Sequence, residues 1–405
     1  MAKIRRLAAE HLEGQSASLL MGLGHGATHW IIATIYVLLP FISKDLGLSY
    51  AAVGGLITLF HTASFVANAG SGAAVDISGR YVGVACFALV AGALALAFVG
   101  FAVNLVWLVL PIIVIGLTNN LWHPAAISFL SRRYPKQRGY ALSLHALGAT
   151  LGDILAPLSA GFLLVVLSWQ GTALVNAIPV FGVAAALVIA LGRNERGQAR
   201  NDAKRRNGKS YLQGVRELAA NRAIMMLCIM AGFRSMTQNG LLVFLPLYLV
   251  NNLGAGPVLV GIAMMSIQVG AIVSGPVAGS WSDRIGRQPV VLGGLILTSL
   301  VVAGMSIVSG TVAFLALTCV LGFVMFAIRP VIHGWTMDLT SDDMSGSAVS
   351  LLFAVQSALT MLVPIVGGLI ADVWGLRSVF YILTATISIS VAMAFFLPDP
   401  RAAER

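Results

Sequence analysis

Six of the seven histidines lie in long apolar stretches, where a polar ring is costly unless it faces a cavity or a polar partner: His25, His29, His61, His123, His145 and His333. His25 and His29 are four residues apart and therefore share one helix face. Imidazole titrates close to neutral pH, so we expect these two rings to bind substrate or to move protons. Hydrogen bonding between helices and metal binding are the alternatives. Because no His, Cys or Asp ligands recur at metal-site spacing, we predict no metal and no cofactor.

A single carboxylate, Asp153, falls deep inside an apolar stretch. An ionised carboxylate is expensive there, which makes Asp153 a candidate to carry a coupled proton. Its alternative role is a gate contact near the extracellular side. His145 precedes it by about two helical turns on a similar side, so it either passes a proton or hydrogen-bonds a neighbouring helix. We predict that Asp153, His145 and His25 serve proton coupling.

Two arginines, Arg234 and Arg329, lie inside apolar stretches of the second half of the chain. A guanidinium in the membrane needs an anionic partner, and its planar fork fits a carboxylate or a phosphate. An anionic substrate is therefore one reading, and a structural pair with Asp338 or with a helix C-terminus is the other. Polar amides nearby either line the same cavity or join helices. The predicted substrate-binding residues are His25, His29, His61, Arg234, Gln238, Gln268, Arg329 and Gln356.

The composition shows what kind of element positions these groups. Hydrophobic residues make up 58% of the chain and charged residues 10%, whereas a soluble domain carries about 25% charged residues. Apolar stretches of this length predict membrane-spanning helices, since lipid excludes open sheets. The net charge of +10 does not indicate nucleic-acid binding, because the basic residues gather in the termini and in loops on one side. The three cysteines have no paired spacing, so we expect no disulfide.

The apolar pattern predicts twelve spanning helices in two similar six-helix bundles. The N-terminal bundle covers residues 1–192, a basic cytoplasmic linker covers 193–222, and the C-terminal bundle covers 223–405. The excess of Lys and Arg in alternate loops places both termini in the cytoplasm. The expected spans are 17–43, 50–73, 81–102, 105–131, 139–166, 169–192, 223–250, 257–281, 289–310, 312–335, 346–371 and 375–397.

One loop pattern occurs twice, once in each half. Gly72-Ala-Ala-Val-Asp76-Ile-Ser-Gly79-Arg80 recurs as Gly279-Ser-Trp-Ser-Asp283-Arg284-Ile-Gly286-Arg287. Other pairs keep nearly the same offset, among them Pro40 with Pro246, His61 with Gln268, and His123-Pro124 with Arg329-Pro330. Parallel repeats with a substrate site between them are a known plan of membrane transporters.

These loops resemble the signature that follows helices two and eight in the major facilitator superfamily. The resemblance implies that both acids and their basic neighbours act as a conformational latch: Asp76, Arg80, Asp283, Arg284 and Arg287. The first copy departs from the signature because Ile77 replaces the usual arginine. The likeness covers almost the whole chain.

Helix five carries Gly152-Asp-Ile-Leu-Ala156-Pro157-Leu-Ser-Ala160-Gly161, which resembles the exporter signature of that superfamily. The arginine of many drug/proton antiporters is absent from helix four, where Asn119 and Asn120 stand. A finer likeness, to fosmidomycin-resistance-type exporters, rests on Gly24-His25, Leu39-Pro40 and Trp122-His123-Pro124-Ala125.

The sequence therefore predicts a secondary transporter of a bacterial inner membrane, not an enzyme. We expect proton-coupled efflux of a small anionic or amphiphilic compound by alternating access. The alternatives are a proton-coupled uptake symporter for an anion, and a non-transporting receptor or lipid scramblase. The expected partners are the substrate, protons and membrane lipids, with no nucleic acid, and the expected oligomeric state is a monomer.

Overall fold

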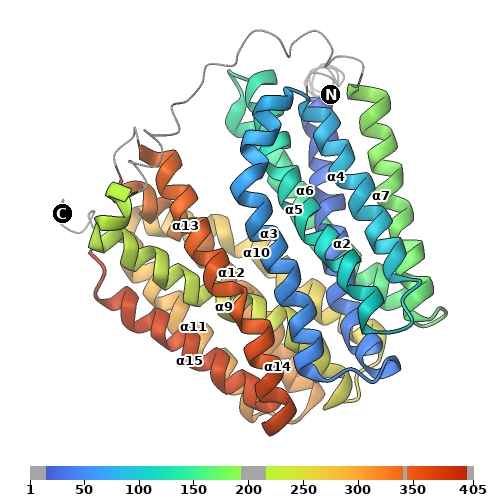
Figure 1. The fold of residues 1–405 in the computed structure, drawn as a ribbon. Helices are drawn as coiled ribbons and strands as arrows, with labels where there is room; N and C mark the ends of the chain where they lie inside the picture. Colours follow the sequence, from blue (N-terminus) through green and yellow to red (C-terminus); the bar gives the residue numbers. More distant parts are fainter. Residues whose placement is uncertain (1–14, 193–215, 341–343, 399–405) are drawn as a thin grey trace, which may run out of the picture. The chain divides into compact units, whose positions relative to one another are not determined.

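The computed structural model describes residues 15–192, 216–340 and 344–398, and every regular element in these ranges is a helix (Figure 1). Within them, the side chains of residues 69, 72–74, 76–78, 345 and 346 are not described. The helices are α2 (Ser16–Asp45), α3 (Tyr50–Ser78), α4 (Tyr81–Val99), α5 (Leu105–Arg133), α6 (Arg138–Leu163), α7 (Trp169–Leu191), α9 (Arg222–Asn251), α10 (Pro257–Ile285), α11 (Arg287–Ile307), α12 (Thr311–Asp338), α13 (Ser345–Thr360), α14 (Leu362–Trp374) and α15 (Arg377–Phe395).

Eleven segments of the described chain are long and apolar enough to cross a membrane, with α13 and α14 together forming one of them. The predicted span that is missing from these eleven, residues 223–250, corresponds to α9, a helix of 30 residues that does not meet the same criterion of apolarity. Polar residues in its middle, including Arg234, Gln238 and Asn239, interrupt its apolar sequence. The helix that departs most from a simple lipid-spanning sequence is thus one that carries predicted site residues.

The chain divides into two compact units. The N-terminal unit consists of Met1–Leu38 and Thr62–Ala203, and the C-terminal unit consists of Leu39–His61 and Lys204–Arg405. The second unit thus includes the end of α2 and the start of α3. Asp372 of α14 accepts hydrogen bonds from the backbone N–H groups of Tyr50 (2.8 Å) and Ala51 (2.9 Å), which caps the first turn of α3.

Small residues let helices of the N-terminal unit approach closely. α4 packs against α5 and α7. Where α2 meets α6, Gly148 and Gly152 each face a backbone carbonyl of α2, and a Cβ at either position would collide with it. From the other side, a Cβ at Gly26 would lie 2.7 Å from the Gly148 carbonyl oxygen. Because only glycine fits, the two backbones lie in direct contact, as in other glycine-mediated membrane helix pairs.

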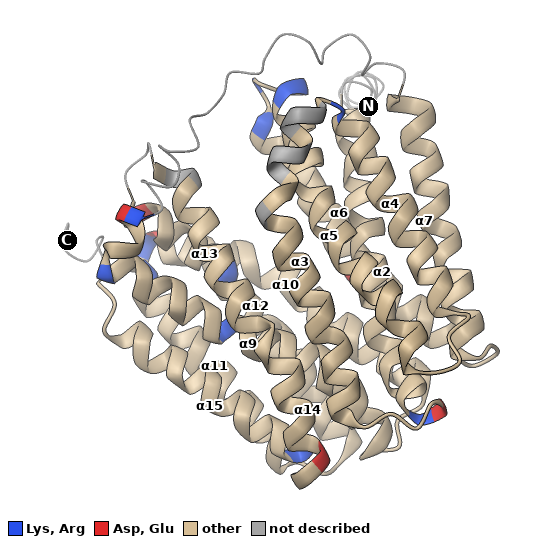
Figure 2. Cartoon of the chain, viewed as in Figure 1, with Lys and Arg blue, Asp and Glu red and all other residues tan. Residues whose placement is uncertain are grey.

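In the C-terminal unit, α10 packs on α12, α11 packs on α12 and α15, and α9 packs on α13 and α15. Charged residues lie mainly at helix ends and connecting turns, and the middles of the helices are largely free of them (Figure 2). Exceptions are Asp153 in the middle of α6 and, in the C-terminal unit, a small amount of Lys or Arg that Figure 2 shows in its middle. Arg234 and Arg329 occupy mid-helix positions of α9 and α12 there.

Turn glycines with positive φ recur at equivalent positions of the two halves. Gly47 (φ 61°) corresponds to Gly254 (φ 64°), and Gly79 (φ 61°) corresponds to Gly286 (φ 102°). L-residues with a side chain rarely adopt this conformation, so glycine is required where these helices end. The repeat that the sequence shows therefore extends to the backbone conformation of its turns.

Candidate functional site

A cluster of imidazoles lies in the N-terminal unit, where the glycine contact holds α2 against α6. Nδ1 of His25 lies 2.8 Å from the backbone oxygen of His145, and the two rings stack with centroids 3.9 Å apart. The close approach of the helices makes this contact possible, because a larger residue at Gly148 would push α6 away. Trp122 of α5 donates its Nε1–H to Nε2 of His145 at 3.3 Å, so the lone pair of that nitrogen is occupied.

One turn further along α2, Nδ1 of His29 lies 3.0 Å from Oδ2 of Asp153 on α6. Their side chains are 27% and 20% exposed, so the pair is only partly buried within the spanning helices. A third ring, His123 of α5, places its Nδ1 2.9 Å from the backbone oxygen of Asn119. Three helices therefore supply the cluster.

The hydrogen bonds assign the protons of His25 and His123. A carbonyl oxygen only accepts, so Nδ1 of each ring must be the donor. In the neutral ring Nε2 then carries a lone pair and no proton. The two Nε2 atoms nevertheless face each other at 3.3 Å. Two lone pairs repel at this distance, so the contact requires a positively charged atom shared between the rings.

A second group of polar residues lies in the C-terminal unit around Arg234 of α9. This side chain is 3% exposed, and its Nη2 donates to the backbone oxygen of Met325 at 2.8 Å. Its Nε is buried and has no hydrogen-bond partner in the described part of the chain. A buried donor without a partner costs about 1–3 kcal/mol, more when it is charged. Arg234 thus retains a donor that a ligand can satisfy.

Arg234 lines a small cavity of about 10 Å³, room for about one water-sized group. Arg329 and His333 from α12 and Gln356 from α13 line it as well, together with Ala231 and Ile332, and none of these residues is a carboxylate. Gln356 accepts a hydrogen bond from Ser235 at 2.8 Å, which fixes its amide. The cavity therefore presents positive charge and hydrogen-bonding groups, and must widen to hold more than a single small group.

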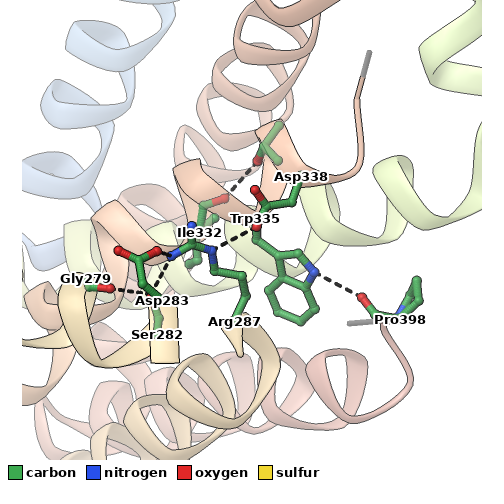
Figure 3. A network of polar contacts seen from close by, with 9 residues as sticks. Gly279, Ser282, Asp283, Arg287, Ile332, Trp335, Asp338 and Pro398 are labelled. Atoms are coloured by element: carbon green, nitrogen blue, oxygen red, sulfur yellow. Dashed lines mark hydrogen bonds and ion pairs between the residues drawn. The ribbon is translucent and has the colours of Figure 1, made fainter. Parts of the chain in front are cut away.

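The second loop signature forms a polar network at the junction of α10, α11 and α12 (Figure 3). Arg287 is 8% exposed. Its Nη1 lies 2.7 Å from Asp283 and 2.6 Å from the Ser282 hydroxyl, and its Nε donates to Asp338 at 2.9 Å. Asp338 at the end of α12 is therefore bound to Arg287.

The remaining predicted residues fall outside these groups or outside the described side chains. His61 has a buried Nε2 without a hydrogen-bond partner among the described residues, and its ring packs against Phe60. Gln238 and Gln268 do not line the cavity around Arg234. Arg80, which precedes α4, and Arg284, in the last turn of α10, are exposed, and the side chain of Asp76 lies outside the described residues.

Two residues of these groups, His123 and His333, are not among the site residues that the sequence predicts. Both had been noted as histidines in apolar stretches, but each is joined to its group by contacts between helices and not by local spacing. For His123 the sequence offers one further signal, the repeat, which aligns it with Arg329.

Comparisons with known proteins agree with this architecture. The family model described as Major Facilitator Superfamily matches residues 21–248 and 227–405. The multidrug resistance protein MdtG of Proteus mirabilis is 24% identical over 299 residues, which are 73% of each chain. A bicyclomycin resistance protein homologue of Haemophilus influenzae is 28% identical over 121 residues, 29% of this chain and 30% of that protein. The match to the multidrug efflux pump PmrA of Streptococcus pneumoniae, at 27% identity, covers 35% of this chain and 36% of the relative.

Solved structures share the fold at low sequence identity. A bacterial homologue of the human lysosomal transporter Spinster, in an inward-facing and unoccupied conformation, superposes with a TM-score of 0.80 at 16% identity, over 95% of this chain and 97% of that chain. A mutant of the nucleoside transporter NupG gives a TM-score of 0.79 at 13% identity, over 94% and 99% of the two chains. With its helical fold, its paired loop signatures and a family model that matches both halves, the chain belongs to the major facilitator superfamily of membrane transporters.

Proposed function

We propose that this transporter exports a small compound with an anionic group, in exchange for protons, by alternating access. In this mechanism a substrate site opens to one side of the membrane at a time. The anionic group is the part of the proposal with the most direct support, and one observation carries it.

That observation is the presence of two arginines around one cavity of the C-terminal unit. Arg234 is buried with one donor unsatisfied among the described residues, and Arg329 lines the same cavity. A charged guanidinium within spanning helices is costly unless an anion or a water-filled cavity faces it. A carboxylate, phosphate or phosphonate group on the substrate supplies the missing acceptor and makes charge-assisted hydrogen bonds with both guanidinium groups.

Export is favoured by three considerations. The relatives named above include a bicyclomycin resistance homologue and a multidrug efflux pump. The sequence of α6 resembles the exporter signature, with Pro157 inside the helix. A membrane potential that is negative inside also favours outward movement of an anion, by about 2.3 kcal/mol per charge per 100 mV.

Protons are the coupling ion in this proposal. The chain has no Gly-x-x-x-x-Gly-Lys-Ser/Thr loop for ATP, and this proposal takes an ion gradient as its energy source. Which residue carries the proton stays a prediction from the sequence. Proton coupling is proposed here for the whole transporter, and a flux measurement tests it without reference to any one side chain.

Two further parts of the proposal, the choice of a probe compound and the location in the membrane, rest on the sequence. The likeness to fosmidomycin-resistance-type exporters suggests a phosphonate as a probe, because its dianion suits two guanidinium groups. We also propose that the protein resides in a bacterial inner membrane with both termini in the cytoplasm, since basic residues gather in alternate loops.

The experiment is transport in proteoliposomes with an imposed pH gradient, using fosmidomycin, small carboxylates and uncharged drugs of similar size. We expect an anionic compound to move against its own gradient while protons move in the opposite direction. Arg234→Ala and Arg329→Ala should each reduce the apparent affinity for the anion at least tenfold, as expected when a charge-assisted hydrogen bond is lost.

The matched control is Arg216→Ala, which removes an exposed arginine outside the cavity. Co-transport of anion and proton in the same direction would overturn export in favour of uptake. Movement of lipid without any solute dependence would instead support a scramblase, and unchanged anion affinity in both arginine variants would remove the anion site from the proposal.

A further inference from the structure

We propose that His25, His29 and His123 bind a divalent transition-metal ion within the N-terminal unit. One ring nitrogen of each of these three residues lies within 4.8 Å of the others. The site goes beyond the proposed export function and differs from the sequence prediction of no metal, which considered only spacing along the chain.

The distance between the two best-placed nitrogens fits a metal ion. Nε2 of His25 and Nε2 of His123 are 3.3 Å apart. Two nitrogens bound to a tetrahedral zinc ion with bonds of about 2.0–2.1 Å are separated by about 3.3 Å. Because hydrogen bonds hold the protons of both rings on Nδ1, each Nε2 carries a lone pair that can bind the ion.

The surroundings of the three rings match those of metal-binding histidines. Ligating histidines usually donate their other N–H to a carboxylate or a backbone carbonyl, which fixes the tautomer and the orientation of the ring. His25 is bound to the carbonyl of His145, His123 to the carbonyl of Asn119, and His29 to the carboxylate of Asp153. A single shared proton explains the contact between His25 and His123 but involves only two of the three rings.

His145 is excluded as a ligand although it touches the cluster. Its Nε2 accepts a hydrogen bond from Trp122, and its ring stacks flat against His25 with an interplanar angle of 18°. It therefore serves as a positioning residue. His29 requires a modest rotation to bring its nitrogen from within 4.8 Å to bonding distance, and its partial exposure gives it the space.

The chemistry of the donors narrows the class of ion. Three neutral imidazoles favour Zn²⁺, Cu²⁺, Ni²⁺ or Co²⁺ over Mg²⁺ and Ca²⁺, which prefer oxygen ligands. Three protein ligands leave a fourth position for water, and the 27% exposure of His29 shows that the rings are not completely enclosed by protein. The nearby Asp153 carboxylate offsets part of the charge of the ion.

The test uses full-length, tag-free protein in detergent, stripped with a chelator and titrated with Zn²⁺. We expect one bound zinc per chain by elemental analysis, competed by Ni²⁺ or Co²⁺ and unaffected by Mg²⁺. His25→Ala and His123→Ala should abolish this equivalent or weaken it at least a hundredfold. Asp153→Asn should keep the stoichiometry and weaken binding about 10–100-fold, as for other residues that hold a ligating histidine.

His61→Ala and His333→Ala are the matched controls, since both remove a histidine from a spanning helix outside the cluster. They should retain the bound zinc. Wild-type protein loaded with Co²⁺ should show the visible absorption of a four-coordinate ion with nitrogen ligands, a measurement that does not depend on any variant folding.

Three results would overturn the proposal. The first is no zinc bound by folded wild-type protein, which would leave a shared proton as the explanation of the contact between His25 and His123. The second is equal loss of zinc from the control variants. The third is a Co²⁺ spectrum with thiolate charge-transfer bands, which would assign the ion to cysteine.

Discussion

At the scale of single residues, the hydrogen-bond partners decide what each polar side chain can do. The carbonyl partners of His25 and His123 fix which nitrogen lacks a proton, and the sequence contains no sign of this. The shared helix face of His25 and His29 was predictable, because it follows from helical geometry alone. The approach of His123 was not, because it depends on how α5 packs beside α2.

The same reasoning predicts a graded effect at Arg234. Arg234→Lys keeps the charge but loses the planar fork, so one charge-assisted hydrogen bond to a carboxylate or phosphonate disappears. We expect the KM for an anionic substrate to rise about 10–100-fold while kcat changes little. Initial rates in proteoliposomes measure both constants. A fall in kcat at constant KM would show that Arg234 acts in the conformational step instead.

The two acids bound to Arg287 should differ in their effect on stability. Asp338 is 18% exposed and accepts a hydrogen bond from the nearly buried Arg287, so Asp338→Ala should lower the free energy of unfolding by about 2 kcal/mol. Asp283 is 58% exposed, so Asp283→Ala should cost only about 0–1 kcal/mol. Thermal unfolding of the purified variants compares the two, and equal shifts in Tm would contradict the difference in burial.

At the scale of the helix, the positions of spans were predictable where apolar residues run uninterrupted. They were less predictable where polar residues or breaks interrupt a span. The long spans were located from hydrophobicity because the bilayer imposes a minimum length. The interruption between α13 and α14 at Met361 was not predicted. The helix α9 is long enough to span the membrane but has polar residues in its middle. The 43 glycines are typical of close helix packing, but the sequence does not show that α2 and α6 are the helices in contact.

The contact between α2 and α6 should be intolerant of any side chain. Gly148→Leu places a branched chain against the backbone of Gly22 and should separate the helices, lowering Tm and abolishing the contact between His25 and the carbonyl of His145. Gly182→Leu on α7 is the matched control, because a Cβ there meets open space. Fluorescence-detected size-exclusion chromatography after heating distinguishes them. Equal stability of the two variants would show that the helices are not in direct contact.

At the scale of the whole molecule, the repeat was the most reliable information in the sequence. It predicts two related halves, and turn glycines at corresponding positions of the two sequence halves share a positive φ. The repeat did not reveal that residues 39–61, which hold the end of α2 and the start of α3, belong by their contacts to the C-terminal unit. Pairings across several helices, such as the bond from Tyr50 to Asp372, have no local pattern.

The orientation of the chain in the membrane makes a direct prediction. In a background with Cys86, Cys228 and Cys319 replaced by serine, a cysteine at Lys136 should face the cytoplasm and one at Ser309 the opposite side, because basic residues mark cytoplasmic loops. Both positions are exposed. A membrane-impermeant maleimide applied to intact cells should label only the Ser309→Cys variant. Labelling of Lys136→Cys alone would reverse the orientation.

The alignment of His123 with Arg329 has a consequence for how this protein arose. If one ancestral gene was duplicated, both copies began with the same side chain at this position. One half now has an imidazole at this position, whose nitrogen lone pair can bind a cation. The other half has a guanidinium, whose N–H groups can donate hydrogen bonds to an anion. On that premise, the preference for cations at one position and for anions at the other diverged after duplication. Exchanging the two residues, one at a time, would recreate symmetric intermediates whose ligand preferences record the order of that divergence.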